Sequence, residues 1–187
     1  MTKELDLTNH LLTAMPGMGD ENFAHTVTYI CEHNDKGAMG IVINRLLEVN
    51  LGEILDHMKI TCTLEEVRKR PVFFGGPVQI ERGFVLHTPN GDWESTLPIT
   101  KDLGLTTSRD ILQAMADGAG PTKSIIALGY AGWGKGQLEQ EIKDNVWLST
   151  PASEAILFDT PVEQRWQTAA GALGIDINLL TSEAGHA

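Results

Sequence analysis

Apolar residues recur three and four positions apart in three stretches of the chain, which is the spacing of an amphipathic helix. The predicted helices cover residues 51–58, 107–118 and 160–174. The third carries the fullest start signal: Thr160 is expected to cap the helix, Pro161 to fill its first position and Glu163 to reach back to the cap amide. We therefore expect at least three helices, none long enough to form a fold alone.

Other stretches alternate apolar and polar residues, or form short apolar runs, as β-strands do. Residues 26–33 alternate, a turn at 34–37 follows, and residues 38–44 return, so we predict a hairpin. Further strands are predicted at residues 72–74, 83–87, 93–98, 124–130 and 146–148. Because hairpins and helices are interspersed without a regular βαβ alternation, the pattern predicts an α+β fold. Nothing in residues 1–187 reads as a linker, so we expect a single domain.

Composition narrows the classes of function. The 187 residues include 42% hydrophobic residues, as in globular proteins, and the formal net charge is −11. Such a charge repels nucleic acid and anionic lipid, so direct DNA binding and membrane binding are disfavoured. The two cysteines are too few for a disulfide framework, and the N-terminus lacks the basic and apolar segments of a signal peptide. We expect a cytoplasmic protein.

Cys31 and His33 are the first candidates for chemistry. Two residues apart on a strand, they are expected to share a face, where an imidazole would make the thiol nucleophilic or redox-reactive. The alternative is that Cys31 is a small buried hydrophobic residue, as free cysteines often are. His25 could join them at a metal, but no spacing marks a fourth ligand, so we predict neither a metal nor a cofactor.

Residues 129–141 form the second candidate. They follow a predicted strand, open a helix and partly resemble a phosphate-binding loop, but Gly136 stands where Ser or Thr would hold Mg²⁺. Two interpretations remain: a tight turn whose glycines let Trp133 pack, or a recognition loop in which Trp133 anchors a partner or a cationic ligand. In the second interpretation the predicted contact residues are Gly132, Trp133, Gly134, Gln137 and Glu139.

A third candidate is the glycine pair at the end of the predicted strand 72–74. Gly75, Gly76 and Pro77 make a sharp strand exit, where another backbone or a ligand can approach closely. A purely structural turn is the alternative. We predict that this turn lies near the Trp133 loop and shares its contact surface.

Several of these segments, in this order, resemble the AlgH/YqgE family of bacterial proteins. They are Ala14-Met15-Pro16, residues 31–44, Gly75–Val78, residues 132–139 and Asn145-x-Trp147. The resemblance implies a bifurcated, partly barrel-like mixed sheet surrounded by helices, in a cytosolic protein often labelled a transcriptional regulator; it implies no catalytic activity. One departure is Leu46, which follows Asn44-Arg45 where the family commonly has Pro.

The charge pattern bears on the regulator label. The only basic cluster, residues 68–70, follows Glu65 and Glu66, which nearly cancel it. We therefore expect any regulation to be indirect, through an unidentified protein or small-molecule partner. The leading hypothesis is a non-enzymatic recognition protein, and the alternative is a thiol-based redox sensor or enzyme that uses Cys31.

Overall fold

Ten strands form one bifurcated sheet in a computed structural model of the chain, which describes residues 5–17, 19–20 and 23–172. The strands are β1 His10–Ala14, β2 Val27–Asn34, β3 Gly37–Val42, β4 Leu46–Asn50, β5 Pro71–Phe74, β6 Val78–Thr88, β7 Thr96–Pro98, β8 Gly104–Thr106, β9 Lys123–Gly134 and β10 Trp147–Pro151. The helices are α1 Leu51–His57, α2 Glu65–Arg68, α3 Arg109–Ala116, α4 Gln137–Lys143 and α5 Arg165–Gly171.

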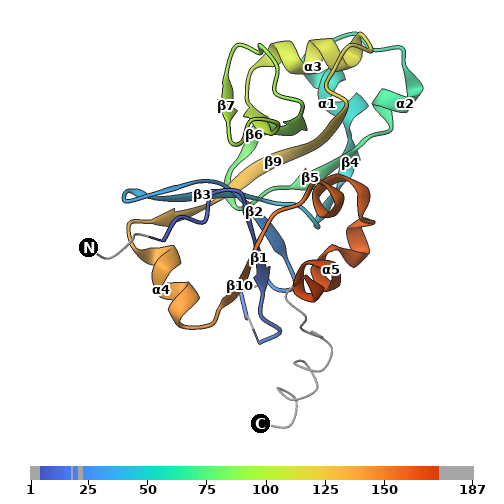
Figure 1. Cartoon of the computed structure of the whole chain (residues 1–187). Coiled ribbons are helices and arrows are strands. Elements are labelled where there is room, and N and C mark those ends of the chain that lie inside the picture. Colours follow the sequence, from blue (N-terminus) through green and yellow to red (C-terminus); the bar gives the residue numbers. More distant parts are fainter. Residues whose placement is uncertain (1–4, 18, 21–22, 173–187) are drawn as a thin grey trace.

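The long strand β9 holds the two branches of the sheet together. One branch has the order β10-β1-β2-β3-β9, and the other places β6, β8 and β7 beyond β9. β5 pairs with β9 in parallel and carries β4, whereas the other strand pairs are antiparallel. Figure 1 shows β9 running from the part of the molecule with α1, α2 and α3 to the part with α4. The curled sheet forms a half-barrel, which confirms the predicted α+β fold and the bifurcated, partly barrel-like sheet.

Most predicted elements are present. The hairpin is β2–β3, and α1 begins with the predicted capping box, in which Asn50 and Glu53 exchange hydrogen bonds. α3 lies within the second predicted helix, and its apolar face is buried. β1, β4 and β8, which have three to five residues each, were not predicted.

The third predicted helix begins later than its sequence signal indicates. Thr160 ends a π-helical turn, Ala155–Asp159, and its hydroxyl donates to the Ala155 carbonyl instead of capping a new helix. A short 3₁₀ turn, Val162–Gln164, follows before α5 begins. The predicted end at Gly174 lies outside the described residues. The start was wrong because the preceding π-helical turn already uses the Thr160 amide and hydroxyl.

Three apolar clusters fill the spaces between the sheet and the helices. The first lies inside the half-barrel, where Tyr29, Phe84 and Leu157 meet. The second lies under α1 and α3, and the third lies between α4 and strands β1 and β10. Among the described helices, none is long and apolar enough to cross a bilayer.

Candidate recognition groove

An open groove of about 900 Å³ lies where the two branches of the sheet separate. One side is formed by β3 and β9, which contribute Met39, Tyr130 and the backbone around Gly132. The other side is formed by β6 and β7, which contribute Phe84 and the half-exposed Leu97. The groove therefore has an apolar floor made by strands that are far apart in the sequence.

Charged side chains of both signs surround this floor. Lys36 and Arg82 are the cations that line the groove, and Glu32 and Glu94 are the carboxylates. The Arg82 guanidinium lies 5.4 Å from the centre of the Phe84 ring, a distance at which a cation is attracted to the ring face. The rim can therefore form ion pairs with a ligand that carries both positive and negative charges.

Gly132 keeps the floor of the groove open. It pairs with Met39 across the β3–β9 ladder, so a side chain at position 132 would point to the same face as Met39. A Cβ atom there would have only ordinary contacts, 3.5 Å from Tyr130 and 3.9 Å from Val78. The missing side chain therefore leaves space for a ligand; no packing neighbour requires its absence.

One edge of β9 carries no strand along this part of the groove. β6 pairs with β9 up to Val78 and Tyr130, and in the described part of the chain only β3 pairs with residues 131–134. The Trp133 carbonyl oxygen lies against Gly37 of β3. Because hydrogen-bonding directions alternate along an antiparallel strand, the peptide groups of Gly132 point to the other side, towards the groove.

Trp133 is not the exposed anchor that one interpretation predicted. Its side chain is 6% exposed and packs with Phe23 and Trp147 in the cluster under α4. The indole N–H donates to Oε1 of Glu141 at 3.1 Å, and the Trp147 indole donates to the same oxygen at 2.9 Å. The segment Gly132–Gly134 is the end of β9 and not a loop, and Trp133 supports the groove from behind.

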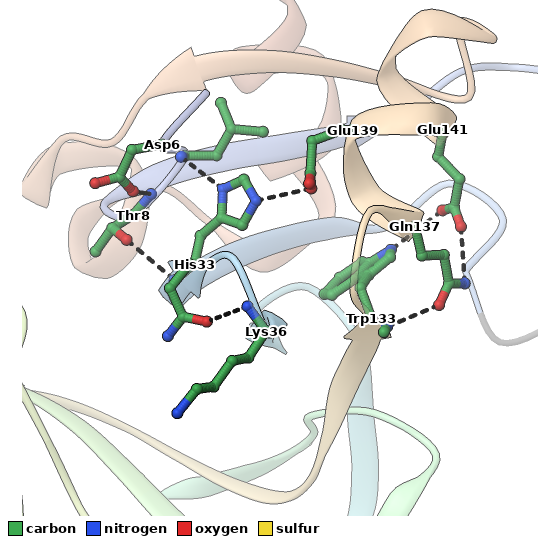
Figure 2. A network of polar contacts seen from close by, with 11 residues as sticks. Asp6, Thr8, His33, Lys36, Trp133, Gln137, Glu139 and Glu141 are labelled. Atoms are coloured by element: carbon green, nitrogen blue, oxygen red, sulfur yellow. Dashed lines mark hydrogen bonds and ion pairs between the residues drawn. The ribbon is translucent and has the colours of Figure 1, made fainter. Parts of the chain in front are cut away.

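A polar network joins the start of α4 to the β2–β3 hairpin (Figure 2). The Gln137 side chain accepts the Gly134 N–H at 3.0 Å and donates to Glu141 at 2.9 Å, which fixes the end of β9. Glu139 accepts a hydrogen bond from Nε2 of His33 at 2.8 Å. These two predicted contact residues are therefore engaged within the protein, and Gln137 occupies the N–H of Gly134 at the edge of β9.

The hydrogen bonds of His33 define its tautomer. The Leu7 backbone N–H donates to Nδ1 at 2.9 Å, so that nitrogen is unprotonated and the proton lies on Nε2, facing Glu139. The ring is almost completely buried and holds the N-terminal segment against β2. His33 is therefore a connecting residue between the N-terminal segment and α4.

The predicted pairing of Cys31 with His33 is wrong. A bulge between Ile30 and Glu32 makes Cys31 the extra residue of β2 and reverses the alternation after it. Cys31 consequently faces the half-barrel core, whereas His33 faces α4. Burial raises the pKa of the Cys31 thiol, which is the opposite of what a nucleophilic thiolate requires.

The Gly75–Gly76–Pro77 turn lies against β9, two residues before Gly132. A Cβ atom at Gly76 would come within 2.1 Å of the Tyr130 backbone, and one at Gly75 within 2.3 Å of the Gly129 carbonyl oxygen. Both glycines are needed for this close approach of two backbones, and only Pro77 is exposed. The turn thus positions Val78 at the groove but offers its own glycines to no ligand.

The segment that separates the groove from its surroundings was not predicted from the sequence. Residues 79–82 bulge out of β6, because Val78 pairs with Tyr130 but Gly83 already pairs with Leu128. Gln79 has a φ of +48°, which is uncommon for a residue other than glycine. The polar run Gln79, Glu81 and Arg82 next to a predicted strand is the signal that marks this arm. Across the residues described, no group of three His, Cys, Asp or Glu side chains is arranged to hold a metal ion.

Comparison with known proteins identifies relatives along nearly the whole chain. A protein of Nitrosococcus oceani, named a UPF0301 protein, is 57% identical over 96% of this chain and 96% of its own. One from Thioalkalivibrio sulfidiphilus, with the same family name, is 56% identical over 100% of both chains. These relatives carry no stated activity in their names.

Solved structures agree with this relationship. The solution structure of the AlgH protein from Pseudomonas aeruginosa has a TM-score of 0.81 and 50% identity, and covers 100% of this chain and 99% of that one. A crystal structure from Corynebacterium diphtheriae shares the fold at 19% identity, with a TM-score of 0.74 over 97% and 94% of the two chains. The AlgH-like family model matches residues 11–178. The chain therefore belongs to the AlgH-like family.

Proposed function

We propose that this protein is a non-catalytic recognition protein of the cytosol, which binds an extended peptide segment of a protein partner in the groove between β3, β9 and β6. The observation that carries the proposal is the edge of β9 at Gly132, which has β3 on one side and no strand on the other among the described residues, between the Val78–Tyr130 pair and the Gly134 N–H that Gln137 accepts. Unpaired strand edges are templates for an added strand.

The groove suits such a segment in shape and chemistry. An extended peptide that pairs with Gly132 would point alternate side chains towards the floor, where Met39, Tyr130 and Phe84 offer apolar contacts. The remaining side chains would meet Lys36 and Arg82 or the carboxylates of the rim. We therefore expect the bound segment to alternate apolar and charged residues.

Two alternatives are less well supported. A thiol-based activity needs an accessible thiolate, whereas Cys31 is 2% exposed and burial raises its pKa. Direct DNA binding needs a cationic face, whereas the chain has a net charge of −11. An indirect regulatory role, through a bound protein, agrees with both observations.

The test is a selection of ten-residue peptides from a random displayed library against the folded protein. Enriched peptides are expected to shift the backbone amide NMR signals of Gly132 and Met39, and to lose binding to Gly132→Leu. That variant fills the groove with contacts no closer than those of a normal side chain. Gly17→Leu is the matched control outside the groove, because a Cβ at Gly17 meets nothing within 4 Å and the substitution is the same.

Either of two results would contradict the proposal: no sequence is enriched, or the enriched peptides bind Gly132→Leu as tightly as the original protein. Thermal unfolding of both variants, expected to match that of the original protein, separates loss of binding from loss of fold.

A further inference from the structure

A second hollow lies on the other face of β6. It is a cavity of about 590 Å³ under α1 and α3, within the usual size range of small-molecule sites. Its interior is almost entirely apolar, with walls from both helices and a floor from β6 and β9. The side chains that define it are Ile54, Met58, Val85, Leu112, Ile126 and Leu128.

The mouth of this cavity is apolar as well. Val49 on β4 is 37% exposed and Ile80 on the bulged arm is 56% exposed, and both line the opening. These are two of the few large hydrophobic side chains that the described structure leaves in water. Exposed apolar side chains around a concave opening are typical of a binding site.

Gly83 gives the cavity its depth. It pairs with Leu128, which lines the cavity, so a side chain at position 83 would point into the same space. A Cβ atom at Gly83 would meet no atom within 4 Å. No neighbour excludes a larger residue here, and the cavity exists partly because this side chain is missing.

One end of the rim is basic. Arg109, the first residue of α3, donates from Nη1 to the Met58 carbonyl at 2.8 Å, which fixes its guanidinium over the end of α1. His57, in the last turn of α1, Thr107 and Ser108 also line the cavity. The fork of a guanidinium matches the two oxygens of a carboxylate.

The acidic groups nearby are engaged elsewhere or stand apart. Glu53 accepts the Asn50 N–H at 2.8 Å in the capping box at the opposite end of α1. Asp110 accepts hydrogen bonds from the Ser108 hydroxyl and the Glu94 N–H. Glu81 lies on the exposed arm across the opening. The basic end is thus the place where a negative head group would be stabilised.

We infer that this cavity binds a small apolar molecule that carries one carboxylate, with its hydrocarbon part among the side chains of α1, α3 and β6 and its carboxylate at Arg109. The inference does not rest on the peptide groove: Phe84 and Thr107 line both hollows, but the cavity is defined by side chains of α1, α3 and β9 that do not line the groove. A molecule bound here would contact both helices and the bulged arm.

The experiment uses octanoate as the probe, with octan-1-amine and octan-1-ol as probes of equal chain length and different head group. Titration of the full chain, followed by backbone amide NMR signals, is expected to show octanoate binding at residues 54, 112 and 128. Gly83→Leu is expected to abolish this binding, whereas Gly132→Leu, which fills the other groove, retains it.

The head group is tested by Arg109→Gln. Loss of a charge-assisted hydrogen bond is expected to weaken octanoate binding about tenfold or more and to leave octan-1-ol binding unchanged. Lys101→Gln removes the same charge from an exposed position outside the cavity and is expected to change neither.

The inference is overturned if octanoate fails to bind, if octan-1-amine binds as tightly, or if Gly83→Leu still binds octanoate. Equal weakening by Arg109→Gln and Lys101→Gln would show a general charge effect and would likewise remove the assigned role of Arg109.

Discussion

The two faces of β6 present two hollows of opposite character. The groove beside Tyr130 is open, is lined by charges of both signs and borders an edge of β9 that no strand of the described residues pairs with at Gly132. The cavity beside Gly83 is smaller, more enclosed, apolar and bordered by one basic end. In our two proposals, the first binds the main chain of a peptide and the second encloses a hydrocarbon. Gly83 and Val85 line the cavity alone, whereas Phe84 and Thr107 line both hollows, so the alternation of side chains along β6 separates the hollows only in part.

Each hollow is kept open by a glycine that the backbone does not require. Neither Gly83 nor Gly132 has a positive φ, and a Cβ at either position would fit without a close contact. The glycines of the neighbouring turn differ, because Gly76 allows two backbones to touch. The contrast distinguishes glycines that make the fold possible from glycines that leave room for a ligand.

The largest expected effect on stability is at Trp133, whose side chain packs in the apolar cluster behind the groove. Trp133→Ala should lower the free energy of unfolding by about 3–5 kcal/mol, because it removes a buried aromatic ring and leaves the Glu141 carboxylate with one indole donor fewer. Urea denaturation measures this. Trp133→Phe, which keeps most of the volume, should lose less. A Trp133→Ala protein of unchanged stability that no longer binds peptide would restore the exposed-anchor interpretation.

A smaller effect is expected at the support of the β2–β3 hairpin. His33→Ala leaves the buried Leu7 N–H without its acceptor and should cost about 1–3 kcal/mol in the free energy of unfolding. Glu139→Gln keeps an oxygen that accepts from Nε2 and should cost less. If both variants lose the same stability in denaturant unfolding, the carboxylate and not the Leu7 hydrogen bond is the important contact.

Cys31 and His33 show what the sequence could and could not predict. Alternation located β2 and β9, yet it assigned Cys31 and His33 to one face because the bulge after Ile30 has no signature in residue type. Gly129, with a φ of +79°, breaks the alternation of β9 in the same way, so that Leu128 faces the cavity and Tyr130 the groove. A single residue that reverses the alternation of side chains therefore decides which face of the sheet the following side chains occupy, and so which hollow they line.

The fold class and the family were predictable from patterns and from motifs in order. The two hollows were not, because each is assembled from strands far apart in the sequence: Met39, Phe84 and Tyr130 in one, Val49, Leu112 and Leu128 in the other. Gly132 was predicted to be a contact residue of a loop, but the structure places it in strand β9. The pairing of distant strands determines which residues form each hollow, and the local periodicity of the sequence does not predict that pairing.

A third prediction concerns His87, which lies behind both hollows. Its Nδ1–H donates to the Pro89 carbonyl at 3.0 Å, and Nε2 lies 2.7 Å from the Thr106 hydroxyl, which is 2.8 Å from that of Thr96. Thr106 lines the cavity and Thr96 the groove. The histidine and its two threonines therefore form one support shared by both sites.

Burial lowers the pKa of His87 below its ordinary value of 6.5 in the folded protein. As pH falls through 6.5, the unfolded chain takes up this proton before the folded protein does, so the free energy of unfolding should decrease on acidification until the folded pKa is reached. Urea midpoints at pH 8 and pH 5 measure the change. In His87→Gln the drop between these pH values should be smaller; an unaltered drop would assign it to other groups.

The smallest expected effect is the most direct test of the comparison. Gly83→Leu should raise the free energy of unfolding by about 0.5–1 kcal/mol, because a glycine within a strand costs about that much in conformational entropy and the new side chain enters free space. Gly132→Leu, nearer the end of its strand, should change stability by less. Thermal unfolding of both variants distinguishes the two kinds of glycine: a loss of stability at position 83 would mean that the fold requires this glycine. A gain would mean that the chain keeps a less stable residue where a larger one fits, which is expected of a position reserved for a ligand.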